Sequence, residues 1–470
     1  MKVRCYLSSA LHLTSFRNRG ATTTGSNRRV ATRSMLASSS ASASPPSSED
    51  VPALSSVDKD AVERRLRNAL WSFFAGDALA APTHWYYGGF AQIRQHYGPD
   101  GIVGYTKPSF ELPGSIMNKS DPNGGGRSKS SGWFGRSSSS SSSSQKTIIG
   151  DVINHGKLEL WDPSRQIHYH ATLAAGENTL EAQLGRVLMK SMVETGGVFD
   201  ANHFQKSYVK FMTTPGSHND AYASTCHRMF FANMVFEGKP PHQCPDNDGH
   251  NVETVDALIL PTVVGLAAAA RSAAQEDGAA KKSWRDEVAR QAAECVRATR
   301  KSKPLERAAA AWSQMVGSAL FSGSVVDECG RVAASMGYRQ PRGDKAQSSL
   351  TACYLDSALP ALLDDVVAFE RTKDRSEVGA TASLWRALLR NANTGGENVH
   401  RGSCLGAVLG SIVSSKASVA SDPELAEGLH DRHDLAKEID DFVNAVMVKN
   451  ETSEKTYVQH AAMTKEKEEL

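Results

Sequence analysis

Residues 395–412 read GGENVHRGSCLGAVLGSI, and their glycine spacing constrains the fold more than any other segment does. Gly402, Gly406 and Gly410 recur every four residues, so on a helix they form one stripe. Glycine inside a helix costs about 0.5–1 kcal/mol relative to alanine, and a stripe of it indicates another backbone packed very close. We therefore expect a central helix whose first turn is held rigidly.

The other apolar segments have helical spacing as well. Besides the helix at 399–414, the pattern predicts helices at 61–81, 180–192, 257–274, 284–299, 304–321, 352–369 and 380–392. No segment shows the sustained alternation of apolar and polar residues that is typical of strands in hairpins. The predicted fold class is all-α, a compact domain of many helices.

Composition excludes several classes of protein. The 470 residues carry 53 basic and 51 acidic side chains, a balance that does not indicate a nucleic-acid partner. The mean hydropathy is −0.38, and the longest apolar run, 257–270, is shorter than the roughly 20 residues that cross a bilayer. The seven cysteines are scattered without a C-x-x-C pair, which indicates neither a disulfide framework nor a zinc–cysteine site.

Three segments stand apart from the predicted domain at 56–446. Residues 1–55 are rich in Ser, Thr and Ala, with seven basic and no acidic residues before Glu49, as in a mitochondrial or plastid transit peptide. A disordered cytoplasmic tail is the alternative. Residues 121–145 include an eight-serine tract and are interpreted as a disordered insertion, and 447–470 as a charged C-terminal tail.

Asp77 is out of place on its helix. It follows Phe73 and Phe74 by four and three residues, which puts its carboxylate on their apolar face. A buried carboxylate is costly unless a cation, a helix N-terminus or N–H donors compensate it. Asp77 is therefore a candidate functional residue; the alternatives are a carboxylate at a fraying helix end or one that caps a neighbouring helix.

Two glycine turns each deliver Glu-Asn to the start of a predicted helix, Gly176–Thr179 and Gly395–Asn398. Asn178 and Asn398 are suitable helix caps, and Glu181 would complete a capping box after Asn178. With Asp77, however, the two pairs supply five oxygen-bearing side chains of the type that Mg²⁺ selects. Helix N-termini also offer N–H groups to an anion such as a pyrophosphate.

Polar clusters in the loops supply further candidates. His168, Tyr169 and His170 precede the first Glu-Asn turn, and such loop histidines are often simply solvated. Four other residues are candidates for the lining of a ligand cleft: His218, Asn219, Asp220 and Asp256.

Three motifs, in this order, resemble the ADP-ribosylglycohydrolase family, which includes dinitrogenase reductase-activating glycohydrolase and the J1-type crystallins. They are Gly-Asp-Ala-Leu-Ala-Ala-Pro at 76–82, Gly-Glu-Asn-Thr at 176–179 and Asn-Thr-Gly-Gly-Glu-Asn at 393–398. The resemblance spans about residues 60–446. It implies an all-α domain with two Mg²⁺ ions in a central cleft.

The family's early metal ligands fall, by position, on Gly176, Glu177 and Asn178, next to Thr179. Two of these positions depart from the family pattern, because a threonine has become Gly176 and an aspartate has become Asn178. Fewer carboxylate charges weaken Mg²⁺ binding. Together with the late motif, the implied metal ligands are Asp77, Glu177, Asn178, Thr179, Glu397 and Asn398.

The late ligands fall on Glu397 and Val399, and valine cannot coordinate a metal. His400 stands where the family has a threonine, and His84 where it often has a glutamate. The resemblance thus implies that one or two Mg²⁺ ions bind, through a set of ligands that has lost carboxylates.

The leading functional hypothesis is a Mg²⁺-assisted hydrolase that cleaves a glycosidic bond to ADP-ribose in a small molecule or an ADP-ribosylated protein. Asp77, Glu177 and Glu397 are the predicted catalytic residues. The predicted substrate-binding residues are His84, His218, Asn219, Asp220, Asp256, Gly395, Gly396 and His400.

Two alternatives remain open. A non-catalytic nucleotide-binding or crystallin-like structural protein is favoured by Val399 and Gly176. An enzyme that acts on another glycosylated substrate, with histidine as acid or base, is favoured by His84 and His400.

Overall fold

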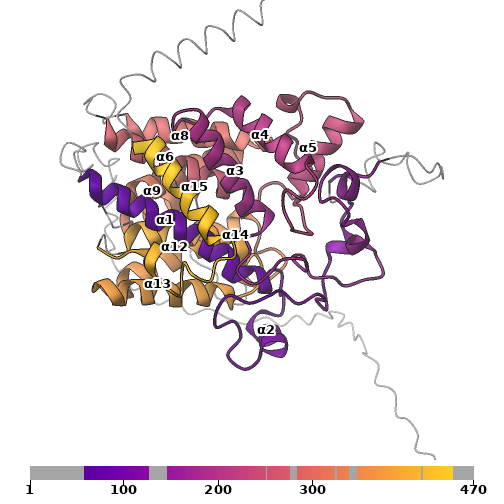
Figure 1. The fold of residues 1–470 in the computed structure, drawn as a ribbon, viewed down its shortest axis with the longest axis horizontal. Coiled ribbons are helices and arrows are strands. Elements are labelled where there is room, and N and C mark those ends of the chain that lie inside the picture. The colour runs from indigo at the N-terminus through magenta and orange to yellow at the C-terminus, as the bar shows by residue number, and fades with distance from the viewer. Residues whose placement is uncertain are drawn as a thin grey trace, which may run out of the picture. The chain divides into compact units, whose positions relative to one another are not determined.

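The computed structural model describes residues 58–125, 146–249, 251–275, 283–322, 325–337, 347–413 and 416–447 (Figure 1). Its helices are α1 (Lys59–Ala80), α2 (Gly89–Tyr97), α3 (Leu180–Glu194), α4 (Ala201–Thr213), α5 (Thr225–Phe236), α6 (Ile259–Ala274), α8 (Trp284–Thr299), α9 (Lys303–Ser322), α10 (Val326–Met336), α12 (Leu355–Thr372), α13 (Glu377–Ala392), α14 (Asn398–Ile412) and α15 (Arg432–Met447). Within these ranges there are isolated β-bridges but no sheet. The all-α prediction is confirmed.

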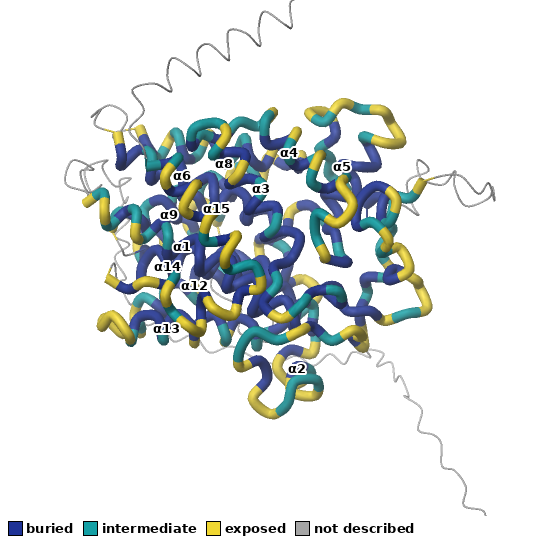
Figure 2. Tube along the Cα trace, in the orientation of Figure 1, coloured by how far each residue is buried: buried dark blue, intermediate teal, exposed yellow. Residues whose placement is uncertain are grey.

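Helices α1 and α14 form the most extensive helix pair in the described part of the chain. A methyl group added at Gly402 would lie 2.4 Å from the carbonyl oxygen of Gly76, and one at Gly406 would lie 2.0 Å from that of Ser72. Two backbones therefore touch along the glycine stripe, as its spacing predicts. Both helices are buried along most of their length (Figure 2).

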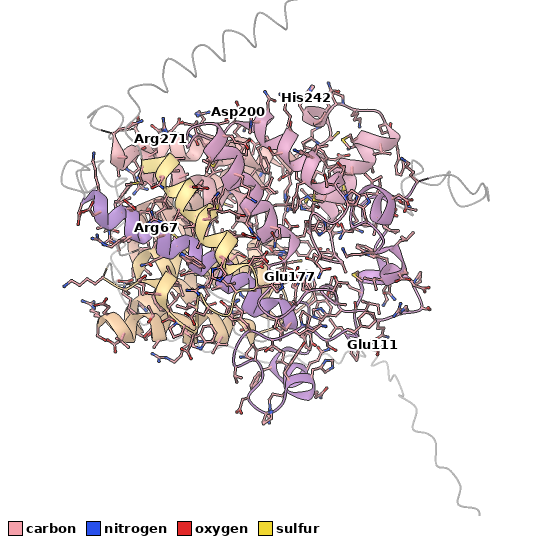
Figure 3. All side chains as sticks on the ribbon, viewed as in Figure 1. Arg67, Glu111, Glu177, Asp200, His242 and Arg271 are labelled. Atoms are coloured by element: carbon pink, nitrogen blue, oxygen red, sulfur yellow. The ribbon has the colours of Figure 1, made fainter. Side chains whose placement is uncertain are left out.

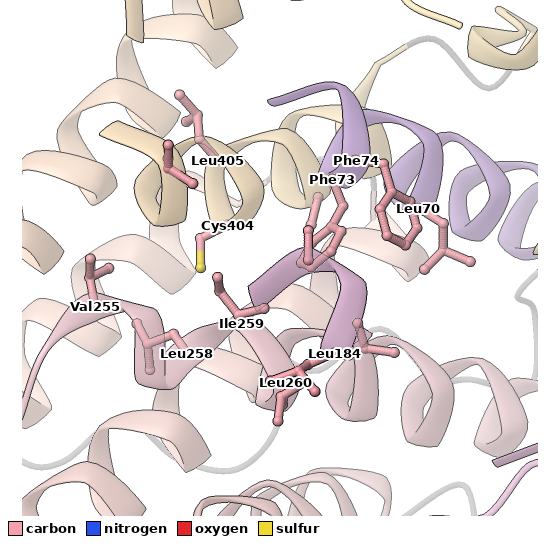
Figure 4. Packing of buried hydrophobic residues seen from close by; sticks show 14 of the residues in the cluster. Leu70, Phe73, Phe74, Leu184, Val255, Leu258, Ile259, Leu260, Cys404 and Leu405 are labelled. Carbon is pink, nitrogen blue, oxygen red and sulfur yellow. The ribbon is translucent and has the colours of Figure 1, made fainter. Parts of the chain in front are cut away.

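The apolar core continues from this pair to α3 and α6. Phe73 of α1, Cys404 of α14, Leu184 of α3 and Ile259 of α6 belong to one cluster of buried side chains (Figure 4). The segment Val255–Ala274 is long and apolar enough to cross a membrane, yet 94% of its apolar window is buried inside the protein, as in a core helix. This core fixes the starts of α3 and α14, where the polar candidates lie.

Each of the eight predicted helices corresponds to a helix of the structure, with ends that differ by a few residues. Helices α2, α4, α5, α10 and α15 were not predicted. Of these, α5 (TCHRMFFANMVF) is buried over most of its length and shows no single apolar stripe. The predicted transit segment, most of the predicted insertion and all but the first residue of the predicted C-terminal tail lie outside the described residues.

Candidate functional site

Asp77 caps the N-terminus of α3. Its Oδ1 accepts hydrogen bonds from the Thr179 backbone N–H at 2.8 Å and from Asn178 Nδ2 at 2.9 Å. Its Oδ2 accepts one from the Thr179 hydroxyl at 2.8 Å. Burial raises the pKa of Asp77, and these three donors oppose that rise. The structure therefore gives this carboxylate the capping role that the sequence left open.

The cap of α3 differs in detail from the expected one. Thr179, not Asn178, is the N-cap residue, and Asn178 instead ties α1 to this loop by donating from Nδ2 to the Phe74 carbonyl at 2.8 Å. Glu181 does not complete a capping box, because its carboxylate accepts from Ser224 Oγ at 2.7 Å and contacts His227 Nε2 at 2.9 Å.

Substitution of Asp77 is expected to separate a cap from a metal ligand. Asp77→Ala leaves buried donors of Asn178 and Thr179 unpaired and should lower the free energy of unfolding by about 2–4 kcal/mol. Asp77→Asn keeps an acceptor for both N–H donors and should cost less than about 1 kcal/mol. Denaturant unfolding of both variants measures the difference, and equal destabilisation would contradict the capping role.

A second polar group gathers at the start of α14. Glu397 is its N-cap residue and His400 lies in its first turn, while His84 follows the 3₁₀ turn Ala81–Thr83 at the end of α1. His84 Nε2 lies 3.3 Å from Glu397 Oε2, and His400 Nδ1 contacts Glu397 Oε1. All three residues are at most 3% exposed. We call His84, Glu397 and His400 the Glu397 cluster.

A strained residue holds His84 in place. Trp85 has φ +62°, a left-handed conformation that costs a bulky residue about 1–3 kcal/mol. The backbone N–H of Trp85 donates to the Gly396 carbonyl at 2.8 Å, and its indole ring stacks on the His84 ring with centroids 4.9 Å apart. The glycine turn before α14 thus fixes the end of α1 directly.

The electrostatics of the cluster favour an ionised carboxylate. Burial alone would raise the pKa of Glu397, but the neighbouring His400 and His84 lower it below its usual range. Burial would lower the pKa of His400, yet Glu397 raises it to about 10. For His84, burial is the stronger influence and lowers the pKa to about 4. Near pH 7 the cluster therefore contains an anionic Glu397, a cationic His400 and a neutral His84.

A buried relay connects this cluster to α3. His84 Nδ1 lies 2.6 Å from His170 Nε2, and the two rings stack with centroids 4.9 Å apart. His170 Nδ1 lies 2.9 Å from Asp220 Oδ1, and Asp220 Oδ2 accepts the Leu180 backbone N–H at 2.8 Å. The sequence predicts Asp220 as a cleft residue but distinguishes His170 only as a loop histidine. No sequence signal pairs it with His84, 86 positions away.

Glu177 has other hydrogen-bond partners than Glu397 has. It is half-buried, and its Oε2 accepts from the Ala174 N–H at 2.7 Å and from Asn219 Nδ2 at 3.3 Å. Figure 3 labels Glu177 among the side chains of the described residues. Asn219 is exposed. His218 is half-buried, and burial lowers its pKa to about 4. The two predicted catalytic glutamates thus belong to different surroundings.

The remaining predicted residues have structural partners. Asp256 forms a buried ion pair with Arg300, with Oδ2 and Nη2 2.7 Å apart. Gly395 and Gly396 have φ of +74° and +62°, and a side chain at either would meet a backbone carbonyl. Asn398 donates from Nδ2 to Thr83 Oγ1 at 2.7 Å, while its buried Oδ1 has no hydrogen-bond partner.

The Glu397 cluster also has the residue types that could hold a metal ion. Among the described residues, His84, Glu397 and His400 each offer a ligand atom within 4.8 Å of the others. Mg²⁺ takes oxygen ligands, whereas two of these three donors are imidazole nitrogens. Of the predicted oxygen ligands, Asp77, Asn178 and Thr179 are joined by hydrogen bonds at the start of α3, and Glu177 directly precedes Asn178 in the same turn. Which ion binds here, and through which of the predicted oxygen ligands, stays a prediction.

The chain was compared with known proteins. A solved structure named "ADP-ribosylglycohydrolase-related protein complex" is similar to it at 14% identity and a TM-score of 0.45, over 83% of this chain and 100% of that one. No curated protein matches the sequence. The sequence model of the family described as ADP-ribosylglycohydrolase matches residues 58–452, most of the chain. This chain belongs to the ADP-ribosylglycohydrolase family.

Proposed function

We propose that the protein is a hydrolase that cleaves an N- or O-glycosidic bond to ADP-ribose, with the Glu397 cluster as its reactive centre. Family membership supports the class of reaction. The observation that carries the proposal is that His84, His170, Asp220, Glu397 and His400 converge from distant parts of the chain into one buried network.

Such a network is costly for a purely structural role. Buried ionised groups lose hydration, and well-packed apolar residues of similar size often stabilise a core equally well or better. The left-handed Trp85 adds strain at the same place. Perturbed pKa values, buried charges and backbone strain gathered at one point favour a functional site over a packing solution.

The chemistry follows from the charge of Glu397. Hydrolysis of a glycosidic bond develops positive charge at the anomeric carbon, and a fixed carboxylate stabilises that charge. Glu397 would orient a water molecule toward this carbon and accept one of its protons while the water oxygen bonds to the carbon. The leaving oxygen or nitrogen takes the electron pair of the broken glycosidic bond and a proton from solvent. His400 and His84 hold the two oxygens of Glu397 in a single orientation.

Aromatic side chains next to the cluster support a nucleotide ligand. Trp85 and Tyr87 are both half-buried, with ring centroids 5.6 Å apart, and Trp85 stacks directly on His84. Tyr169 lies behind them, 5.9 Å from His84 between ring centroids. Flat aromatic faces bind an adenine or a ribose ring by stacking. This edge is the side from which ADP-ribose would reach Glu397.

One observation favours the non-catalytic alternative. The cluster is almost fully buried, and the surface pocket of about 400 Å³ beside α2 shares no lining residue with it. A protein that binds ADP-ribose without cleaving its conjugates would have the same family membership and the same buried network. Binding and turnover therefore have to be measured separately.

Release of free ADP-ribose tests the proposal. Full-length protein is incubated with peptides that carry N-linked or O-linked ADP-ribose, and the products are separated by chromatography. We expect time-dependent release from at least one linkage, with enzyme-like saturation. Calorimetry with ADP-ribose is the companion measurement. Tight binding of ADP-ribose without its release from any conjugate would support the non-catalytic alternative. If the protein shows no binding and no release, both the hydrolase and the non-catalytic ADP-ribose-binding protein are refuted.

A further inference from the structure

We propose that His170 and Asp220 are positioning residues for the hydrolysis, because they fix the ring of His84 and, through it, the carboxylate of Glu397. This role rests on the proposed function, and it belongs to two residues outside the Glu397 cluster. Neither residue has to touch the substrate. Their effect is on the orientation of the carboxylate that activates water.

The orientation of the His84 ring is not fixed by its own torsion preferences. The last side-chain torsion of histidine, like that of glutamate, is broadly distributed, so neighbouring groups decide how the ring and the carboxylate lie. His84 has such a neighbour at each ring nitrogen: Nδ1 lies 2.6 Å from His170 Nε2, and Nε2 lies 3.3 Å from Glu397 Oε2. A rotation of the ring would break both contacts at once.

The contact between the two imidazoles is directional. Their ring planes differ by only 10°. Hydrogen bonds weaken steeply when donor and acceptor are out of line, and the N–H and the lone pair of an imidazole lie in its ring plane. His170 therefore restrains the tilt of the His84 ring as well as its position, and the restraint is the same whichever of the two nitrogens donates.

Asp220 fixes His170 from the other side. Its two carboxylate oxygens lie 2.9 and 3.1 Å from His170 Nδ1, and Oδ2 also accepts the Leu180 backbone N–H at 2.8 Å. His170 and Asp220 are each 1% exposed, so bulk water does not compete for these contacts. The carboxylate thus ties the His170 ring to the start of α3.

The loop that carries Asp220 is itself held in place. Its three consecutive backbone carbonyls accept hydrogen bonds from side chains of the segment 154–172: Asn219 from Thr172 Oγ1 at 2.6 Å, Asp220 from Asn154 Nδ2 at 3.0 Å and Ala221 from Trp161 Nε1 at 3.1 Å. Buried carbonyls need partners in any loop, but these partners fix the loop relative to another segment. A group that positions a reactive side chain needs such a supporting shell.

His170→Ala is expected to lower kcat for ADP-ribose release by about 10–100-fold, because a displacement of about 1 Å can cost as much as 100-fold. KM should change by less than about threefold, since His170 does not touch the substrate. Steady-state kinetics on one conjugate measures both constants. His203→Ala is the matched control: this histidine of α4 also contacts a carboxylate, that of Glu194 at 3.3 Å, and its loss should leave kcat unchanged.

Two conservative variants separate positioning from anchoring of the loop. The amide of glutamine extends as far as Nε2 of histidine and so reaches His84, whereas the amide of asparagine extends only as far as Nδ1 and so reaches Asp220. Positioning predicts a higher kcat for His170→Gln than for His170→Asn, and anchoring of the loop predicts the reverse order. This comparison also decides if His170→Ala does not fold, because both variants keep a polar group in the buried space.

Asp220→Asn tests whether Asp220 acts through His170. The amide keeps the shape of the carboxylate and an acceptor for the Leu180 N–H, so the fold should be kept. We expect a loss of about 3–10-fold in kcat. The double variant Asp220→Asn/His170→Ala should be no slower than His170→Ala alone, because contributions along one chain of contacts do not add. Losses that multiply in the double variant would contradict action through His170.

The activity of the wild type separates failure of this role from failure of the proposed function. If the wild type releases ADP-ribose and a folded His170→Ala keeps kcat within about threefold of it, the positioning role is overturned and the proposed function stands. A higher kcat for His170→Asn than for His170→Gln has the same meaning. A wild type that releases ADP-ribose from no conjugate would refute the proposed function and, with it, the positioning role.

Discussion

Gly406→Ala is expected to destabilise the protein by about 3 kcal/mol or more, because the new methyl group meets backbone. Its carbon would lie 2.0 Å from the Ser72 carbonyl oxygen, and neither α1 nor α14 can yield without moving the other. The displacement would carry the start of α14, and with it Glu397, away from His84. Loss of stability and loss of the site should therefore occur together.

The matched control is Gly330→Ala, in the exposed part of α10, where an added methyl group meets nothing within 4 Å. The same change there should stabilise the protein by about 0.5–1 kcal/mol, because alanine is the better helix former. Denaturant unfolding of both variants gives the comparison. Equal effects at the two positions would contradict the close packing of α1 on α14.

Glu397→Gln is expected to lower kcat/KM for ADP-ribose release by at least about 100-fold, the usual effect of removing an acid–base or charge-stabilising group. Glutamine has the same shape, but it can neither hold the charge at the anomeric carbon nor take the proton of water. The amide also leaves His400 without its anionic partner. Far-UV circular dichroism and unfolding would show whether the fold is kept.

The activity of Glu177→Gln is the matched comparison for that of Glu397→Gln. The carboxylate of Glu177 accepts from the Ala174 N–H and from Asn219, outside the Glu397 cluster. The loss of activity should therefore be less than about tenfold. The sequence predicts equal roles for these two glutamates, so the pair of variants distinguishes the sequence-based expectation from the structural one.

Most of the fold was predictable because its signals are local. The glycine stripe of α14 and the apolar faces of α1, α3 and α6 follow from spacing within a single helix. The helix that packs against the glycine stripe could not be predicted from the sequence. Which helix packs against Gly402 and Gly406 depends on a contact across more than 300 residues, and spacing within one segment holds no information about it.

The site was predictable only in part, for the same reason. Asp77 and Glu397 both stood out in the sequence, one by its apolar neighbours and one by its glycine turn. The structure gives them different surroundings: donors of the α3 start satisfy Asp77, while histidines surround Glu397. Burial and partner type, which long-range packing determines, separate a carboxylate held by donors of a helix start from one held by histidines.

His170 shows the limit most clearly. In the sequence it is one of two histidines beside a tyrosine, and solvated loop residues look the same. Its role depends on one imidazole ring and one carboxylate that the fold brings to it from positions 84 and 220. A hydrogen-bond chain between separate loops has no sequence period, so no spacing argument could have found it.

The most direct test of the account measures kcat/KM for ADP-ribose release from one conjugate by wild type, Glu397→Gln and Glu177→Gln, side by side. The account predicts that Glu397→Gln is nearly inactive with its fold intact, while Glu177→Gln keeps most of the activity. Equal losses in both variants, or a greater loss in Glu177→Gln, would contradict the placement of the reactive centre at Glu397.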